Sequence, residues 1–438
     1  MINYISLILL FPILLNAQDI LTAEDAIRIG LQHNYDIHIA RNTAEIAKNN
    51  AGRGTAGFLP TLDALGNYQQ RSSEQETNSP IGFGNSTAEN LSGSISLNWT
   101  LFDGMQMFAN RRRYNDLAKL GEYQARYQIE NTVAGILAAY FNLVRQEQML
   151  DVAGNARDVS KTRLNKARMR RELGGTSATD FLNAQVSFNS DAAAVLNQAL
   201  QVTIARKNLN ILLGRDPAAP LRVEKEIGLG DVEFEIENLL HLAQERNSLL
   251  QFTLQGKRAA DQNVKVAQSL FYPRVSLSAS YGYTDTETDR KAADPGSLFP
   301  KTVASQTKDA AVGLNLSFNL FNGFRNKIDL QNAKIEAKNQ ELALADAKNQ
   351  IAGLIQEKYD TFKTQLELLR LEKENEVSAR QNLDLQLERF NIGTANSLEF
   401  RDAQVNLIRA QTALIAAGYQ ARITKLEIEQ LTGRVEIQ

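Results

Sequence analysis

The sequence predicts an α+β membrane protein in which two tandem repeats each supply a pair of strands and a long helical hairpin. The stretch Trp99–Gly104 (WTLFDG) recurs in the second half as Phe318–Gly323 (FNLFNG). Each copy ends a run of alternating apolar and polar residues and opens a long segment without proline, the pattern of a strand followed by a helix. The motif register, which aligns Trp99 with Phe318, persists as far as Gly214 and Gly433, which indicates one rigid unit present twice.

The register changes ahead of the motif and thereby locates a loop of variable length. In this upstream register, Phe58–Pro60 matches Phe271–Pro273, and the two segments are closer together than the two motif copies are. The six-residue difference falls between Pro60 and Leu101. Surface loops tolerate such changes in length better than strands or helices do.

The first residues predict an exported protein. An apolar run at residues 5–15 predicts a signal peptide over residues 1–17, cleaved after Ala17. The basic residues that usually precede such a run are missing, and a buried strand is the alternative. No other run approaches the roughly 20 apolar residues of a membrane helix, so we do not expect helices to cross a bilayer. The mature chain then divides into a first repeat over 18–220 and a second repeat over 221–438.

Composition excludes several classes of function. The chain contains no cysteine, which excludes disulfides, thiolate metal sites and a cysteine nucleophile, and we expect no lipid on an N-terminal cysteine. A net charge of −2 argues against a nucleic-acid partner. Of the three histidines, His33 and His38 have an imperfect spacing for a metal, and His241 is remote, so solvated surface is the preferred interpretation. No phosphate-binding loop or nucleophile elbow is present, and we expect no cofactor.

Helical periodicity fills most of each repeat. Thr22–Asp25 is a candidate capping box at the start of the first helical segment. The stripe from Val133 to Val144 has the spacing of a buried helix face. The predicted helical segments are residues 22–57, 104–172, 180–213 and 236–270, then a long helix to about Phe390 and a return helix to Leu431.

Four strands are predicted, and they do not suit a soluble sandwich. They lie near residues 61–71, 91–102, 274–285 and 310–321, and polar loops at 72–90 and 285–307 join them in pairs. One face of each is apolar and the other carries Ser, Asn and Gly, which fits a lipid-facing exterior and a polar lumen. Four strands cannot close a barrel, and an open edge in lipid leaves backbone groups unpaired. We therefore expect the edges to pair with other copies.

Aromatic residues mark both ends of the predicted strands, as they do at membrane interfaces. A single aromatic would be ordinary core, and it is the distribution over two ends that favours the membrane interpretation. The aromatics nearer the helices are Phe58, Trp99, Phe102, Phe271, Phe318 and Phe321, and those nearer the loops are Tyr68, Tyr281 and Tyr283.

These features resemble the TolC-like outer membrane efflux proteins, or outer membrane factors, over the whole mature chain. The resemblance rests on the tandem repeat, on the strand-to-helix junctions with Phe102, Gly104, Phe321 and Gly323, and on the hairpin motifs that open at Gly174 and Gly393. It implies a homotrimer with a shared 12-stranded β-barrel in the outer membrane of a Gram-negative bacterium, continued by a periplasmic α-helical barrel. It also implies a channel of a tripartite efflux or type I secretion system, with a periplasmic adaptor (membrane fusion) protein and an inner-membrane pump as partners.

The same resemblance points to the hairpin tips as functional sites. It implies adaptor contacts at Gly174, Gly175, Thr176, Gly393 and Thr394, and an acidic ring at the periplasmic entrance formed by Glu399, Asp402 and Asp180. The alternative is that acids simply favour the first turns of helices, which explains Asp180 and Glu399 better than Asp402. In the first repeat, Asn183 stands at the position that matches Asp402, so the second repeat would supply most of the ring.

Three alternatives stay open at this point. Arg111–Arg113 opens the first long helix, and we prefer a solvated face to a ring that selects anions in the lumen. The chain could instead be a secreted helical-bundle scaffold without a membrane span. An enzyme is the third class, although no catalytic constellation is visible.

Overall fold

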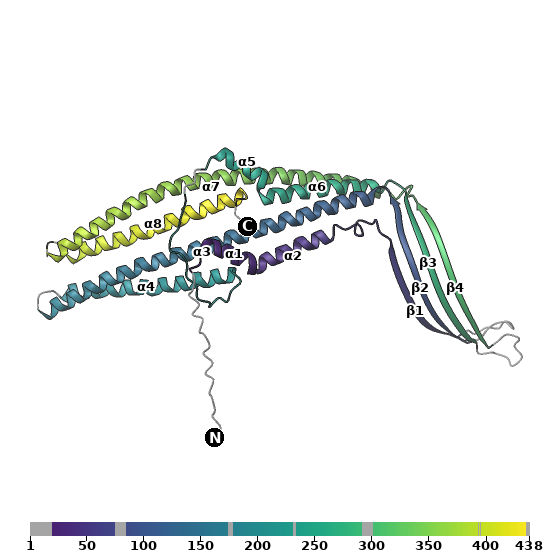
Figure 1. Cartoon of the computed structure of the whole chain (residues 1–438), viewed down its shortest axis with the longest axis horizontal. Coiled ribbons are helices and arrows are strands. Elements are labelled where there is room, and N and C mark those ends of the chain that lie inside the picture. Colours follow the sequence, from purple (N-terminus) through teal and green to yellow (C-terminus); the bar gives the residue numbers. More distant parts are fainter. Residues whose placement is uncertain are drawn as a thin grey trace, which may run out of the picture. The chain divides into compact units, whose positions relative to one another are not determined.

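The computed structural model describes residues 20–74, 85–173, 178–230, 234–290, 301–392, 394 and 396–434. The predicted signal peptide, residues 1–17, lies outside these described residues. Within them the chain forms one four-stranded sheet and eight helices (Figure 1). The strands are β1 (Thr61–Ser73), β2 (Ser86–Asp103), β3 (Arg274–Arg290) and β4 (Thr302–Ser317). The helices are α1 (Ala23–His33), α2 (Tyr35–Asn49), α3 (Gln106–Glu172), α4 (Ala178–Leu212), α5 (Ile236–Arg246), α6 (Ser248–Ser269), α7 (Arg325–Asn391) and α8 (Ser397–Leu431).

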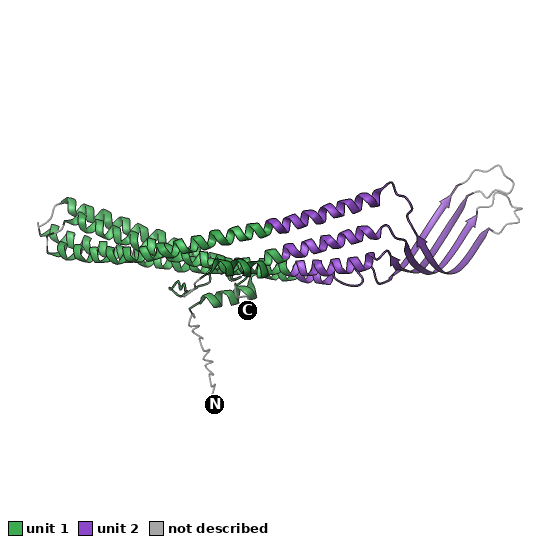
Figure 2. Cartoon of the chain, turned by 90° about the horizontal axis from the view of Figure 1, so that it is seen from above, with its two compact units in different colours: residues 1–42, 123–251, 347–438 green, residues 43–122, 252–346 purple. Residues whose placement is uncertain are grey.

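The chain folds into two compact units (Figure 2). Unit 1 contains residues 1–42, 123–251 and 347–438, and unit 2 contains residues 43–122 and 252–346. Each unit therefore takes residues from both sequence repeats, and α3 and α7 each continue from unit 2 into unit 1. No helix in the described part of the chain has the length and apolar character needed to span a membrane.

The sheet of unit 2 is antiparallel, with the strands in sequence order, so β1 and β4 are its edges. Its strands continue further into the polar segments than alternation predicts: β1 reaches Ser73 and β3 reaches Arg290. The reason is that the hydrogen-bonded ladder depends on backbone groups rather than on apolar side chains. Polar cross-strand pairs accompany it there, and Gln70 Nε2 donates to Glu89 Oε1 at 3.3 Å.

The last strand begins at Thr302, earlier than the predicted 310–321, and its C-terminal end comes four residues earlier than predicted because the neighbouring strand begins there. β4 stops at Ser317, which pairs with Arg274, the first residue of β3. Pro273 precedes Arg274 and has no N–H to donate. Phe318 and Leu320 consequently follow the strand instead of belonging to it.

The predicted helical segments 22–57 and 236–270 each divide into two helices at an asparagine. Asn34 and Asn247 have extended backbones, with ψ of 127° and 119°. The Asn34 Nδ2 donates to the Leu212 carbonyl at 2.7 Å, and the Asn247 Nδ2 donates to the Leu431 carbonyl at 2.9 Å. The two contacts are equivalent in the two repeats, so each break is a corner that ties a short helix pair to the end of a return helix.

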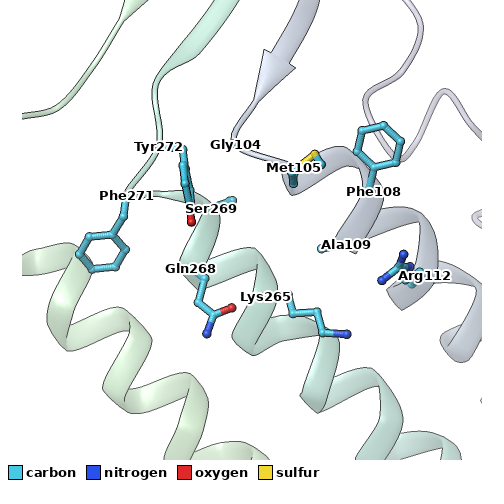
Figure 3. A pocket seen from close by; sticks show the side chains of 10 residues that line it. All are labelled: Gly104, Met105, Phe108, Ala109, Arg112, Lys265, Gln268, Ser269, Phe271 and Tyr272. Atoms are coloured by element: carbon cyan, nitrogen blue, oxygen red, sulfur yellow. The ribbon is translucent and has the colours of Figure 1, made fainter.

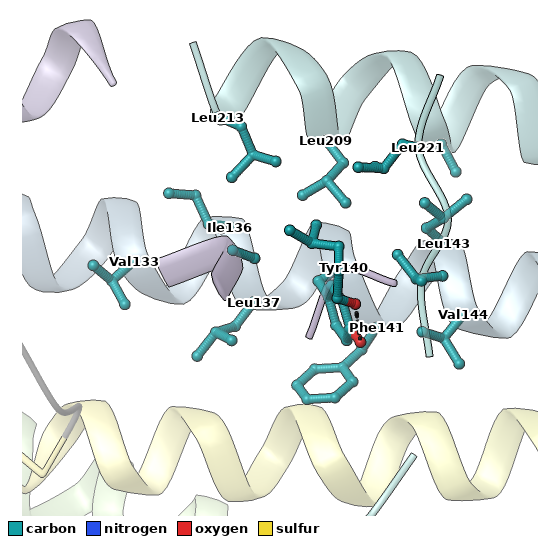
Figure 4. Close-up of a cluster of buried hydrophobic side chains, with 14 of the residues drawn as sticks. Val133, Ile136, Leu137, Tyr140, Phe141, Leu143, Val144, Leu209, Leu213 and Leu221 are labelled. Atoms are coloured by element: carbon teal, nitrogen blue, oxygen red, sulfur yellow. Dashed lines mark hydrogen bonds between the residues drawn. The ribbon is translucent and has the colours of Figure 1, made fainter. Parts of the chain in front are cut away.

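The main hydrophobic core of unit 1 lies where α3 packs against α1 and α4 (Figure 4). The predicted stripe from Val133 to Val144 is buried, and Tyr140 is only 2 % exposed. The Tyr140 hydroxyl donates to the Leu21 carbonyl at 3.1 Å, which satisfies the polar end of a buried ring. Burial raises the pKa of Tyr140, so this hydroxyl remains a donor.

A second, smaller core in unit 1 holds the helices of the second repeat together. Ile355, which matches Ile136 in the motif register, is fully buried in it. Phe362 packs edge-on against Phe234, with ring centroids 5.2 Å apart. The other buried members are Leu239, Ala243, Leu250, Ile351 and Ile428.

Candidate functional site: hairpin ends and strand-to-helix junctions

The hairpin ends of unit 1 lie at the boundaries of α3 with α4 and of α7 with α8. The predicted tip residues Gly174, Gly175, Thr176 and Gly393 lie outside the described residues. Thr394 is described, and both its N–H (2.9 Å) and its hydroxyl (3.2 Å) donate to the Arg389 carbonyl. These bonds satisfy a carbonyl that the last turn of α7 leaves open.

The three predicted acids have different local roles. Glu399 stands in the first turn of α8, where its Oε1 accepts a hydrogen bond from Asn396 Nδ2 at 2.9 Å. Asn396 Oδ1 in turn accepts from the Glu399 N–H at 2.9 Å, so Glu399 belongs to the cap of the helix. Asp402 is exposed one turn further along α8, and Asp180 is exposed in the first turn of α4. The helix-start interpretation therefore explains Glu399 more fully than it explains Asp402.

An ion pair that sequence reasoning missed links the two return helices. Arg401 on α8 holds Asp191 on α4 with two parallel bonds, of 2.7 and 2.8 Å. The Asp191 side chain is only 8 % exposed. In the motif register, Asp191 matches Ala410 and Arg401 matches Leu182, so a comparison of the two repeats does not reveal this ion pair.

Arg163 on α3 is the second cation of this cluster. Its Nη2 donates to the hydroxyl of Ser397, the first residue of α8. Burial lowers the pKa of Arg163, the neighbouring Arg401 lowers it further, and Asp180 and Asp191 act in the opposite direction. An arginine stays protonated in proteins even so. The predicted acid Asp180 therefore contributes to a charge cluster that joins the first hairpin to the start of α8.

Two further contacts hold the start of α8. Gln404 Nε2 donates to the Ala156 carbonyl of α3 at 3.0 Å in a fully buried position. Phe400 stacks on Phe390 at the end of α7, with ring centroids 5.5 Å apart and an interplanar angle of 23°. The ends of the two hairpins are thus held by buried polar bonds as well as by ring stacking.

The strand-to-helix junctions of unit 2 show why the repeated motif has its residue types. Asp103 Oδ1 accepts from the Met107 N–H at 3.1 Å, and Asn322 Oδ1 accepts from the Asn326 N–H at 3.5 Å, so the Asp or Asn caps the following helix. The glycine after it has a left-handed backbone, with φ of +69° at Gly104 and +66° at Gly323.

The two glycines differ in their surroundings. A Cβ at Gly104 would lie 2.5 Å from the Ser269 carbonyl oxygen, whereas a Cβ at Gly323 would meet nothing within 4 Å. The phenylalanines differ too, since Phe102 is half-buried and Phe321 is 72 % exposed. The junction at Gly104 is therefore packed against other residues of the chain, whereas the junction at Gly323 is exposed.

Among the described residues, no group of three or more His, Asp or Glu side chains is placed to hold a metal ion. His38 Nε2 lies 2.8 Å from the Gln32 carbonyl, and His241 lies 3.7 Å from Glu245 on an exposed face.

Comparison with known proteins supports the resemblance to outer membrane efflux proteins. The sequence profile described as "Outer membrane efflux protein" matches residues 26–215 and again residues 239–434. The chain is 22% identical to the outer membrane protein TolC of Escherichia coli K12 over 87% of this chain and 76% of TolC. It is 21% identical to the outer membrane efflux protein BepC of Brucella suis over 78% of this chain and 72% of BepC.

The fold agrees with solved structures as well. The crystal structure of the Campylobacter jejuni CmeC outer membrane channel superposes with a TM-score of 0.78 at 16% identity, covering 94% of this chain and 87% of CmeC. Two matched segments of one profile, one in each repeat, account for most of the chain. The chain therefore belongs to the outer membrane efflux protein family, and it is an outer membrane efflux channel.

Proposed function

We propose that three copies of this chain form one passive channel that carries substrates from the periplasm to the outside of the cell. Three four-stranded sheets would supply a 12-stranded barrel in the outer membrane. The observation that carries the proposal is the open sheet, whose edge strands β1 and β4 have no partner within the described chain. Unpaired backbone groups are not tolerated in lipid, so another copy must supply the missing partner.

Exposed apolar side chains support the same assembly. On β4, Val312, Leu314 and Leu316 are 80 %, 67 % and 71 % exposed. These residues alternate with polar ones and so share one face of the sheet. Lipid would cover this face of the barrel.

A helix stripe supports contact between copies outside the sheet. Ile328, Ile335 and Leu342 on α7 recur at every seventh position and are 51 %, 60 % and 57 % exposed. A heptad spacing places them along one seam of the helix, the arrangement that packs against a neighbouring helix. We assign this seam to a helix of the next copy, in a helical barrel that crosses the periplasm.

The hairpin ends are the proposed docking region for a periplasmic adaptor protein and an inner-membrane pump, in a tripartite efflux or type I secretion system. Family membership supports this assignment. The proposed role is conduction, without catalysis by the channel itself.

The proposed entrance ring consists of Glu399, Asp402 and Asp180 from each copy. A ring of carboxylates attracts cations and disfavours anions at a narrow opening. We expect Glu399→Gln with Asp402→Asn to reduce cation selectivity and block by multivalent cations in planar-bilayer recordings. The amide of Gln can still accept from Asn396, so the helix cap survives. Asp360→Asn, an exposed carboxylate in the middle of α7, is the control, and unchanged selectivity in the double variant would leave these acids as helix-start residues only.

Topology is tested with single cysteines, because the chain contains none. We propose that the predicted loops 72–90 and 285–307 face the outside. Ser86→Cys, at the start of β2, should react with a membrane-impermeant thiol reagent on intact cells. Thr394→Cys, at a hairpin end, should react only after the outer membrane is broken. The reverse pattern of labelling would refute the proposed orientation.

A further inference from the structure

A pocket in unit 2 lies between the start of α3 and the end of α6, beside the Gly104 junction (Figure 3). Its volume is about 820 Å³. Gly104 lines it, and the chain passes there directly from β2 into α3. The pocket is therefore built at the point where the sheet gives way to helices.

The pocket is apolar at the end near the strands and basic further along the helices. Phe108 and Tyr272 lie nearer the strands in Figure 3 than Arg112 and Lys265 do. The apolar end is open, since Met105 is 61 %, Phe108 49 % and Tyr272 60 % exposed. A site with this polarity fits a molecule that has both an apolar part and an anionic part.

The two cations have no countercharge in the pocket. Among the described residues, no carboxylate lines it, and neither Arg112 nor Lys265 has a hydrogen bond or an ion pair with another side chain. The neighbouring Arg113 behaves differently, because it donates to Asn263 of α6 at 3.1 Å. The run Arg111–Arg113 is thus not one uniform solvated face: Arg113 ties α3 to α6, and Arg112 is left to face the pocket.

Comparison of the repeats shows that the junction does not need these cations. In the motif register, Gln331 stands at the position that matches Arg112. In the upstream register, Gly52 stands at the position that matches Lys265. The apolar residue Phe271, by contrast, has a phenylalanine as its counterpart. The second junction carries cations at other positions, Arg325 and Lys327, so the shared plan of the repeats does not require cations at the positions of Arg112 and Lys265.

We propose that this pocket binds an anionic phospholipid, with its phosphate between Arg112 and Lys265. The inference rests on the proposed placement of the sheet in the membrane, which puts the pocket at the membrane surface. Arg112 is six residues into α3, or about 9 Å along the helix at 1.5 Å per residue. The acyl end then lies beside Phe108 and Tyr272, and the headgroup extends away from the sheet, as it does in the adjacent bilayer. Basic residues at this depth favour anionic headgroups.

The test is native mass spectrometry of the detergent-extracted complex titrated with phosphatidylglycerol, phosphatidylcholine or inorganic phosphate. We expect the complex to retain phosphatidylglycerol in preference to phosphatidylcholine, and inorganic phosphate not to displace it. Arg112→Gln with Lys265→Gln should weaken phosphatidylglycerol binding by about 30-fold. Arg325→Gln with Lys327→Gln removes two exposed cations at the other junction, and it should bind as the wild type does.

Arg112→Lys with Lys265→Arg keeps both charges and should restore binding, which separates loss of charge from damage to the fold. Equal retention of phosphatidylglycerol by the wild type and the Gln variant would overturn the inference. Equal retention of phosphatidylcholine, or displacement of the lipid by inorganic phosphate, would overturn it as well. The same spectra give the mass of the assembly, so loss of the trimer, which would contradict the proposed function, is distinguished from loss of lipid alone.

Discussion

The two repeats share one plan but differ in how completely the chain buries them. Tyr140 of the first repeat is 2 % exposed and bonds to Leu21, whereas the matching Tyr359 is only half-buried and carries Lys363 over its ring. Leu21 of the first repeat and Val223, just beyond it, form a parallel bridge, and both belong to the core cluster around Tyr140. The difference shows that the core around Tyr140 is packed more completely within the chain than the smaller core around Tyr359.

The largest expected effect separates the two tyrosines. Tyr140→Ala removes a fully packed ring and should destabilise the protein by about 3–5 kcal/mol. Tyr359→Ala should have a clearly smaller effect in the dissociated chain, because its ring is half-exposed there. Unfolding monitored by circular dichroism in a detergent that separates the copies measures both. Equal losses of stability in the two variants would contradict the difference in packing between the two repeats.

The ion pair of Asp191 with Arg401 gives the next effect. Asp191→Ala leaves the largely buried guanidinium of Arg401 without its partner and should destabilise the protein by about 2–3 kcal/mol. This loss is smaller than for a fully buried ion pair because Arg401 keeps some contact with water. Asp191→Ala with Arg401→Leu places at both positions the residues that the motif register pairs with them. We expect the double variant to be more stable than the single one. A double variant as unstable as the sum of two singles would show that the two side chains act independently.

The two junction glycines should also differ in how much their substitution destabilises the protein. Gly323→Ala should destabilise by about 1–2 kcal/mol, because alanine disfavours a left-handed backbone. Gly104→Ala should destabilise more, since its Cβ would also meet the Ser269 carbonyl oxygen at 2.5 Å. Thermal unfolding of the two variants under the same conditions decides this prediction. A larger effect at Gly323 would mean that the open junction is packed against something in the assembled protein.

The smallest effect concerns the caps of α1 and α5. Thr22 Oγ1 accepts from the Asp25 N–H at 3.1 Å, whereas Glu235 makes no side-chain cap of α5. Thr22→Ala should destabilise by about 1 kcal/mol at neutral pH, and Glu235→Ala should have little effect.

Hydrogen bonds from Arg28 and then from Thr22 lower the pKa of the Asp25 carboxyl. Because the pKa of Asp25 is lower in the folded than in the unfolded protein, its ionised carboxylate stabilises the fold at any pH above the unfolded-state pKa. This stabilisation is lost as the pH falls through the folded-state pKa. The difference between wild type and Thr22→Ala should therefore shrink in acid. A difference that grows in acid would contradict this account of the cap.

Sequence alone predicted the repeat, the four strands and the long helical hairpins, because each depends on local periodicity. It placed the ends of β4 and the breaks at Asn34 and Asn247 less well, since these depend on a neighbouring strand and on the carbonyls of Leu212 and Leu431 far along the chain. The capping role of Asp103 in the repeated motif could have been predicted from the sequence, because it depends only on neighbouring residues.

The contacts that tie the hairpins together were not within reach of those rules. Asp191 and Arg401 are 210 residues apart and follow no repeat register. The predicted acids Glu399 and Asp402 share a helix, as their spacing required, but their role at an entrance stays a prediction.

The mass of the assembly in detergent tests the central claim most directly. A chain that leaves both edges of its sheet and the α7 seam uncovered should be extracted from the outer membrane as a complex of three copies. Light scattering combined with native mass spectrometry should therefore report three times the mass of the mature chain. A stable monomer with the same secondary structure would contradict the account, because the uncovered edges would then need no partner.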